Sequence, residues 1–423
     1  MDIRPFPGWR YARRDVSDVL APPYDILHQQ DKDDLLARSE RNIVAVDLPH
    51  VPPKQLGPES EYVAAAETLG AWKTDGTLAQ DPEAIYVYQQ TYRWAGQSYT
   101  RRGMIAGVRA TALGEDVIPH EHTFAGPKAD RLKLTELTRT QLSSIFGFYD
   151  DPDRAVANIL AGQVDRQPDA SGMLHGVKEE LWAITDRASI DGIRQALAAK
   201  PVYIADGHHR YTTAMNYRDA LAAAGSIDRE HPANFVMFTL VAREDPGLLV
   251  LPTHRLVRGL IEPFSMQWLA EQMGPTFTMQ PIDPPDDLAD MDAILAPHGP
   301  GTMGLMSKEG FWTLKLTDPD AMAAAAPDQP QPWRKLDVAV LHTLILEKIL
   351  APAEGADFEV SYTPDGNQAA KALADGWAQV AFCLQGTPLA AVEAVADAGA
   401  SMPHKSTYFY PKLATGLVLK PLI

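Results

Sequence analysis

Residues 202–214, VYIADGHHRYTTA, are the stretch that decides how this chain folds around its most reactive side chains. The short apolar run 202–205 is typical of a buried strand, and it leads directly into Asp206 and Gly207. The residues after them, as far as Leu221, predict a helix. Gly207 permits a tight backbone and the close approach of a ligand, and the Asp206 carboxylate is expected to cap the helix. The segment therefore predicts a strand, a turn and a helix.

Three side chains that can carry positive charge fall in the first turn of this predicted helix: His208, His209 and Arg210. Cations are disfavoured there because the helix dipole already presents partial positive charge. A bound anion would explain the arrangement: free amides and Arg210 grip a phosphate, while His208 and His209 act in catalysis. The alternative is that both imidazoles are neutral and only cap or pack locally.

A second segment, residues 118–131, gathers histidines, acids and cations within a dozen residues. In an extended strand His120 and His122 point to one side, as a pair of metal ligands would, and Glu121 points to the other. Glu121 is alternatively a general base, with Lys128 and Arg131 as anion ligands; a solvated charged loop is the third interpretation. A complete metal site would need further ligands from the first segment: Asp206, His208 or His209.

A third segment, residues 402–412, brings Lys405 together with the hydroxyls of Ser406 and Thr407. A point charge with two hydroxyl donors suits a phosphate, although the glycines of a Walker loop are absent. The aromatic residues 408–410 should tie this loop down by packing. Residues 253–255, Thr-His-Arg, are a weaker candidate of the same kind.

Elsewhere the chain alternates irregularly between strand-like and helix-like stretches. Residues 85–94 and 98–110 flank a turn and predict a β-hairpin, so part of the sheet is antiparallel. Apolar spacing predicts helices over 58–72 and 336–350 and a buried strand over 234–241. We therefore expect an α+β fold with mixed, partly antiparallel sheets and flanking helices.

The chain has 423 residues, more than one ordinary core uses, so two packed lobes are expected. The turn signal after residue 149 suggests an N-terminal α+β lobe over 1–150. The second α+β lobe then covers 151–423 and carries the Asp-Gly-His-His-Arg turn.

Composition narrows the function further. Acidic residues outnumber basic ones by 55 to 38, a net charge of −17, which disfavours a nucleic-acid partner because phosphate backbones need a positive face. The single cysteine, Cys383, lies in an apolar run and is expected to be a buried thiol, without a disulfide or a Cys-based zinc site. No apolar stretch approaches the roughly 18 residues of a membrane helix, and no secretory signal is visible. We expect a soluble cytoplasmic protein with no membrane partner.

Several of these motifs carry a family resemblance. Residues 22–25 (PPYD), 203–211 (YIADGHHRY) and 402–413 (MPHKSTYFYPKL) occur in order, and the chain resembles the domain-of-unknown-function family ten-fifteen of bacteria and archaea. Residues 120–123 resemble that family's His-Glu-x-Thr motif. The Asp-Gly-His-His-Arg turn alone is similar to phosphate-binding turns of the ParB and sulfiredoxin-like group, which includes an ADP-dependent free serine kinase. Together the resemblances imply phosphoryl chemistry on serine, phosphoserine or a related metabolite.

The leading hypothesis is thus an enzyme of phosphoryl transfer or phosphate-ester chemistry on a small phosphorylated metabolite or a nucleotide such as ATP or ADP. Gly207 and Arg210 would bind the phosphate, Glu121 or Asp206 would act as base or metal ligand, and Lys405 would neutralise developing charge. Mg²⁺ is the expected cation. Two alternatives stay open, a non-catalytic ligand-binding protein and a metal-dependent hydrolase built on four histidines: His120, His122, His208 and His209. The oligomeric state is left open.

Overall fold

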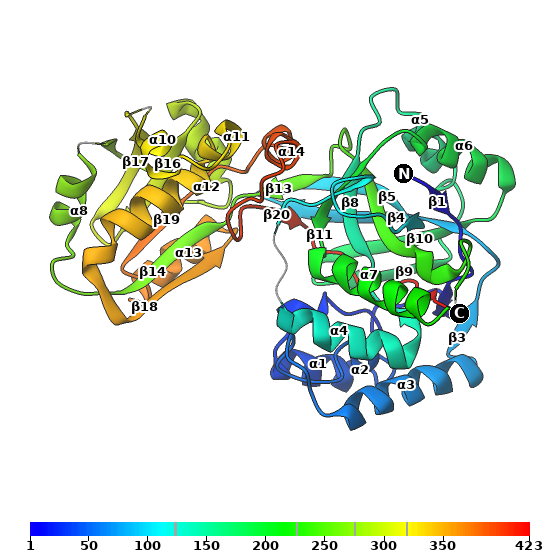
Figure 1. The fold of residues 1–423 in the computed structure, drawn as a ribbon. Helices are drawn as coiled ribbons and strands as arrows, with labels where there is room; N and C mark the ends of the chain where they lie inside the picture. The colour runs from blue at the N-terminus through cyan, green and yellow to red at the C-terminus, as the bar shows by residue number, and fades with distance from the viewer. Residues whose placement is uncertain (122–124, 226, 275, 319) are drawn as a thin grey trace. The chain divides into compact units, whose positions relative to one another are not determined.

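The computed structural model describes residues 1–121, 125–225, 227–274, 276–318 and 320–423. The chain forms two compact units, the first made of Met1–Leu248 and Pro411–Ile423 and the second of Leu249–Tyr410 (Figure 1). The boundary expected at residue 150 lies inside the first unit, because β8 (Ile145–Tyr149) pairs with strands that follow it in the chain. The turn after residue 149 instead precedes helix α5 (Ala155–Ala161), and the backbone amides of residues 156 and 157 in its first turn donate to Asp151.

A nine-stranded mixed sheet organises the first unit. Pairing is antiparallel except between β6 and β11 and between β8 and β12. β1 (Ile3–Arg4) joins at β5, and two short ribbons pair β2 (Trp9–Tyr11) with β3 (Leu78–Gln80) and β7 (Thr140–Gln141) with β21 (Lys420–Pro421). The remaining strands run in the spatial order β6 (Val117–Ile118), β11 (Val202–Asp206), β8, β12 (Phe235–Ala242), β5 (Gln97–Arg109), β4 (Ile85–Trp94), β10 (Val177–Ile184) and β9 (Ala170–Leu174).

Helices of the first unit pack around this sheet. One face of the sheet forms an apolar core with α5, α6 and α7, in which Ile204, Ile193 and Tyr211 are buried. α4 packs against both α3 and α7, and this layer carries much of the site described below. The helices are α1 (Gln29–Arg38), α2 (Val44–Asp47), α3 (Glu59–Thr74), α4 (Ala125–Thr138), α5 (Ala155–Ala161), α6 (Arg187–Leu197) and α7 (His208–Ala223).

The second unit is built on a six-stranded sheet in which every pairing is antiparallel. A separate ribbon pairs β13 (Leu249–Leu251) with β20 (Tyr408–Tyr410). The sheet order is β15 (Phe277–Ile282), β17 (Gly310–Leu316), β16 (Thr302–Ser307), β19 (Val380–Cys383), β14 (His254–Leu260) and β18 (Glu354–Thr363). The α-helices are α8 (Met266–Met273), α9 (Met291–Leu295), α10 (Ala321–Ala325), α11 (Gln331–Arg334), α12 (Asp337–Val340), α13 (Gly366–Ala374) and α14 (Leu389–Asp397).

Both faces of this second sheet are buried. Along β19, Val380 and Phe382 belong to one apolar cluster, whereas Ala381 and Cys383 belong to another. Cys383 is fully buried and free, as its apolar surroundings predict, and burial raises the pKa of its thiol.

The structure confirms the α+β class and most of the expected elements. The predicted hairpin is β4–β5, the predicted helix over 58–72 is α3, and the predicted strand over 234–241 is β12. The helix predicted over 336–350 is α12 followed by a π-helical segment, Leu341–Ile349, with its apolar residues in the core. Among the described residues, none of the helices is both long and apolar enough to cross a bilayer.

Candidate functional site

The strand–turn–helix predicted from residues 202–214 is present. β11 ends at Asp206, Gly207 adopts a φ of 101°, and α7 begins at the next residue. This backbone angle favours glycine, and a Cβ atom on Gly207 would lie 3.0 Å from the Arg210 guanidinium and press on it. The predicted cap by Asp206 is wrong: Gly207 is the N-cap residue and makes no side-chain cap. The Asp206 carboxylate faces two cations instead.

Asp206 links the turn to the C-terminal segment of the first unit. Its Oδ2 lies 2.6 Å from Lys412 Nζ, and its Oδ1 lies 3.5 Å from Arg210 Nη2. Burial would raise the pKa of Asp206, but the ammonium of Lys412 and the guanidinium of Arg210 outweigh burial and hold that pKa well below its usual range. Asp206 is therefore ionised at neutral pH and fixes both cations beside the turn.

His208 is a buried neutral imidazole. Its Nε2 accepts a hydrogen bond from the backbone N–H of His120 at 3.2 Å, and the two rings meet edge to face with centroids 4.7 Å apart. Burial, reinforced by His120, lowers the pKa of His208 well below its usual range, and burial lowers the pKa of His120 to about 4. Of the interpretations of this turn, neutral local packing therefore describes His208; His209 is half-buried in the same turn.

Glu121 is the acid of the second segment that approaches the turn. Its Oε2 lies 3.8 Å from His208 Nδ1, and its side chain remains 32% exposed. The structure thus brings the His-Glu segment and the Asp-Gly-His-His-Arg turn together. A carboxylate that is open to solvent beside a buried imidazole has access to a ligand.

Arg131 brings α4 into the same neighbourhood. Its Nε donates to Asp130 at 2.8 Å, its Nη1 donates to the carbonyl of Asp47 at 2.6 Å, and its guanidinium lies 3.9 Å from the Tyr24 ring centroid. Tyr62 completes the set, because its hydroxyl donates to the other Asp130 oxygen at 2.7 Å. Arg131 Nη2, in contrast, is buried without a hydrogen-bond partner among the described residues.

A small pocket lies where Arg131 meets α7. Arg131, Arg210, Thr213 and Asp47 are among the residues that line it. Thr213 Oγ1 is also buried without a hydrogen-bond partner in the described part of the chain. The pocket volume is about 50 Å³, enough for about four water-sized groups. Two unsatisfied buried donors beside a second guanidinium make this pocket suited to a tetrahedral oxyanion.

Asp47 is the one acid that lines the pocket. Burial raises the pKa of its carboxyl, although Arg131 and Arg210 act in the opposite direction. Two guanidiniums, those of Arg131 and Arg210, therefore face one carboxyl among the described residues of the lining.

The members of this cluster that sequence reasoning missed include Tyr24, Asp47, Tyr62, Thr213 and Lys412. Tyr24 and Lys412 belong to the quoted motifs 22–25 and 402–413, so the motifs contained them without indicating their roles. Thr213 follows Arg210 by three residues, a spacing that places both on one helix face. Asp47 carries no sequence signal, since its position depends on α2 packing beside α3.

The remaining predicted ligands lie elsewhere. Lys128 is half-buried on α4, three residues before Arg131, and does not line the pocket. Lys405, Ser406 and Thr407 belong to the second unit, where Lys405 is exposed and the Ser406 hydroxyl donates to the carbonyl of residue 403. The cation that the C-terminal motif supplies within the first unit is Lys412 instead of the expected Lys405.

The histidine-based metal site has less support from this geometry. His122 lies outside the described residues, and His120 is buried. No group of three or more His, Cys, Asp or Glu side chains suited to a metal is found among the residues that the structure describes. His208 Nε2 points to a backbone amide. The described residues therefore offer no complete donor set for a resident metal ion.

The family is shown by sequence. A family model described as "Protein of unknown function (DUF1015)" matches residues 3–339, and the chain belongs to this family. The matched range includes the turn, Glu121, Arg131 and Thr213, whereas Lys412 lies beyond it. No curated protein matches the chain.

Solved structures that are similar to this chain include three that are matched over most of their own length. A free serine kinase mutant in complex with AMP is 12% identical with a TM-score of 0.36, over 74% of this chain and 92% of that one. A conserved hypothetical protein from Pyrococcus furiosus is 12% identical with a TM-score of 0.33, over 74% of this chain and 95% of that one. SbnI with a C-terminal truncation from Staphylococcus aureus is 13% identical with a TM-score of 0.35, over 75% of this chain and 87% of that one. Because these similarities are low, the function of this chain is inferred from its own site.

Proposed function

We propose that this protein binds the phosphoryl group of a small phosphorylated metabolite or nucleotide in the pocket of Arg131, Arg210 and Thr213, and that it catalyses phosphoryl transfer there. The observation that carries the proposal is the pair of buried donors, Arg131 Nη2 and Thr213 Oγ1, without partners among the described residues. An unsatisfied buried donor costs about 1–3 kcal/mol. A phosphoryl oxygen would remove that cost for both donors at once.

The size of the pocket indicates which part of the ligand enters it. A volume of about 50 Å³ accommodates a phosphoryl group and excludes a nucleoside or an amino acid. The remainder of the ligand would then extend past Arg210 towards the turn, where Asp206 and Glu121 are partly exposed. The reacting end of the ligand and the acids of the turn would meet there.

Of the two acids, Glu121 is the better general base. Asp206 is held ionised by Lys412 and Arg210, so a proton taken by its carboxylate would break two ion pairs. Glu121 lies 3.8 Å from a neutral imidazole, and its side chain is 32% exposed, so a substrate hydroxyl can reach it. We assign to Glu121 the removal of a proton from an attacking hydroxyl, whose oxygen forms the new P–O bond while the bond from phosphorus to the donor's bridging oxygen breaks. The bridging oxygen leaves with the electron pair on the remainder of the donor, and Arg131, Arg210 and Lys412 neutralise the charge on the transferred group.

Magnesium belongs to the proposal only as a companion of the ligand. No donor set for a resident ion is present in the described residues, so no step depends on it. A metal ion would enter bound to phosphate oxygens and water, as Mg²⁺ commonly does.

The test is a binding and turnover screen of the full chain with inorganic phosphate, phosphoserine, AMP, ADP and ATP, each with and without Mg²⁺. Thermal shift detects a ligand that binds the folded state, because such a ligand raises apparent stability by about 2.7 kcal/mol at a hundred times its Kd. ³¹P NMR of the same mixtures then measures transfer. We expect a phosphorylated ligand to bind and its phosphoryl group to move. Binding without any turnover would favour the non-catalytic alternative, and no binding at millimolar ligand would overturn the proposal.

A further inference from the structure

A second cavity of the first unit shares no lining residue with the pocket of Arg131. It lies among the segments next to β1, the start of α6, the loop before β12 and the end of the chain. Its volume is about 720 Å³, within the range of roughly 300–1,000 Å³ that is usual for small-molecule sites. The phosphoryl site does not account for it.

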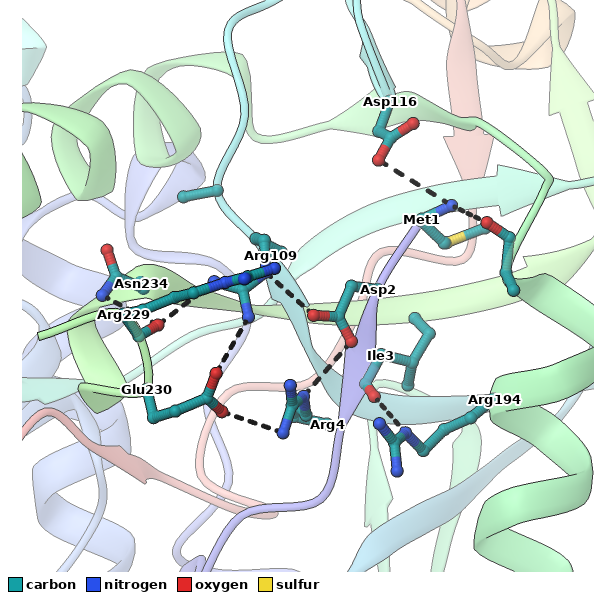
Figure 2. Close-up of polar contacts among 12 residues, drawn as sticks. Met1, Asp2, Ile3, Arg4, Arg109, Asp116, Arg194, Arg229, Glu230 and Asn234 are labelled. Atoms are coloured by element: carbon teal, nitrogen blue, oxygen red, sulfur yellow. Dashed lines mark hydrogen bonds and ion pairs between the residues drawn. The ribbon is translucent and has the colours of Figure 1, made fainter.

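Two arginines beside this cavity are already paired. Figure 2 shows that Arg4 and Arg109 each contact both Asp2 and Glu230. The separations are 3.2 and 2.9 Å for Arg4 and 2.8 and 3.6 Å for Arg109. These four side chains balance one another in charge, and two of them, Arg4 and Glu230, line the cavity.

Lys420 is different, because it is a buried cation without an acid. Only 2% of it is exposed, and its Nζ donates to the carbonyls of Pro232 at 2.8 Å and Pro421 at 3.4 Å. No carboxylate lies within ion-pair distance of it in the described part of the chain. Buried lysines are rarely left unpaired, and burial lowers the pKa of Lys420 to about 7. An anion in the cavity would supply the missing partner.

Arg194 supplies a second cationic group on the same wall. Its Nε donates to the carbonyl of Ile3 at 3.0 Å, as Figure 2 shows, and its Nη1 lies 3.6 Å from Asp191. The lining holds four basic side chains and three acidic ones, so the acids disfavour a dianionic phosphate more than a monoanion.

Apolar side chains complete the cavity. Phe6, Ile190 and Phe235 line it together with several prolines. Such walls favour a ligand with an apolar body, since burying apolar surface is the main source of affinity in small-molecule sites. The cavity thus combines apolar walls with one buried amine.

We propose that this cavity is a binding site for a small organic carboxylate with an apolar body, whose carboxylate pairs with Lys420 and Arg194. The apolar part lies against Phe6, Ile190 and Phe235. This site is separate from the phosphoryl pocket and does not depend on the function proposed for it.

Titration calorimetry at neutral pH with benzoate and with its neutral analogue benzamide tests the proposal. We expect benzoate to bind and benzamide to bind at least roughly tenfold more weakly, because only benzoate pairs with the amine. Lys420→Met should fold, since methionine has a similar length and removes a buried amine, and should lower benzoate affinity roughly tenfold or more. Lys133→Met, a change at an exposed lysine paired with Glu59, is the matched control and should leave the affinity unchanged.

Three results would overturn the site: no benzoate binding at millimolar concentration, equal affinity for benzoate and benzamide, or unchanged affinity in Lys420→Met. If Lys420→Met fails to fold, Arg194→Met takes its place, with an expected loss of roughly threefold to tenfold; an unchanged affinity there overturns the proposal equally. Inorganic phosphate added as competitor should leave benzoate binding intact, and competition would contradict two separate sites.

Discussion

Arg131 in the first unit and Arg255 in the second are both buried arginines, but their hydrogen bonds differ. Arg255 donates to the backbone carbonyls of residues 253, 404 and 405 and to Nε2 of His342, so each of its three nitrogens has a partner. Arg131 is held by Asp130 and Asp47 and lines a pocket, and its Nη2 is buried without a hydrogen-bond partner among the described residues.

This difference distinguishes Arg255, whose hydrogen bonds stabilise the protein, from Arg131, which can also bind a ligand. Arg255 fastens the loop that carries Lys405, whose sequence looked like a phosphate site. Arg131 is also held by several hydrogen bonds, but its Nη2 has no partner among the described residues and could donate to a ligand. The bonding of a buried cation therefore says more about its role than the composition of the segment around it.

The largest effect is expected from Arg131→Met. The change leaves the buried carboxyls of Asp130 and Asp47 without their cation, which should lower the free energy of unfolding by about 3–5 kcal/mol and abolish binding of AMP. Urea unfolding of the full chain measures the first quantity and calorimetry the second. The double variant Arg131→Met/Asp130→Asn should recover part of the stability but none of the binding. If Arg131→Met lost less than about 1 kcal/mol of stability, or still bound AMP, the distinction between Arg131 as a ligand-binding group and Arg255 as a structural group would be wrong.

Arg255→Met should affect stability alone. It strips charge-assisted hydrogen bonds from three backbone carbonyls, and we expect a loss of about 2–3 kcal/mol in the free energy of unfolding. Binding of AMP and inorganic phosphate should match that of the wild type wherever the variant is folded. A phosphate affinity that fell in proportion to that of an Arg131 variant would show that the comparison is wrong.

Thr213→Val sharpens the comparison with a smaller change. The Thr213 hydroxyl has no partner to lose among the described residues, so stability should hold within about 0.5 kcal/mol, while phosphate affinity should fall roughly threefold to tenfold. Thr253→Val is the matched control: its hydroxyl is equally buried and unpartnered in the described structure, but it belongs to the second unit. Calorimetry with inorganic phosphate and AMP should separate the two variants. Equal affinities would count against the pocket.

The smallest effect concerns Asp206 and pH. Lys412 and Arg210 lower the pKa of Asp206 in the folded state. Asp206 therefore stabilises the folded state fully above its unfolded pKa of about 3.9, and this stabilisation is lost as the pH falls through the folded-state pKa. Asp206→Asn should therefore be less stable than wild type by about 1 kcal/mol at pH 7. This difference in stability between the variant and the wild type should disappear in the acid range below about pH 4. Urea midpoints across a pH series measure it, and a gap independent of pH would refute the ion pairs.

Local pattern predicted the local elements of this fold. The alternation in 85–110 gave the hairpin, and the sequence from Val202 to Arg210 gave the strand, the turn and the helix, because each depends on neighbours in the chain. The domain boundary depends on long-range pairing. β8 pairs with β11 and β12, which no local signal at residue 150 reveals.

The site divides in the same way. Glu121, Asp206, Arg131 and Arg210 were chosen for their residue types, and the structure brings them together in one region of the first unit. Lys405 was chosen by the same criterion but lies in the other unit. Residue type identifies groups capable of holding a phosphate, whereas their convergence depends on tertiary packing.

The most direct test of the central claim is a crystal structure of the wild-type protein grown with AMP, phosphoserine or tungstate. The phosphoryl or tungstate oxygens are expected within hydrogen-bond distance of Arg131 Nη2 and Thr213 Oγ1, with Arg210 on the same anion. An anion bound at another place, with both donors still facing an empty pocket, would contradict the claim.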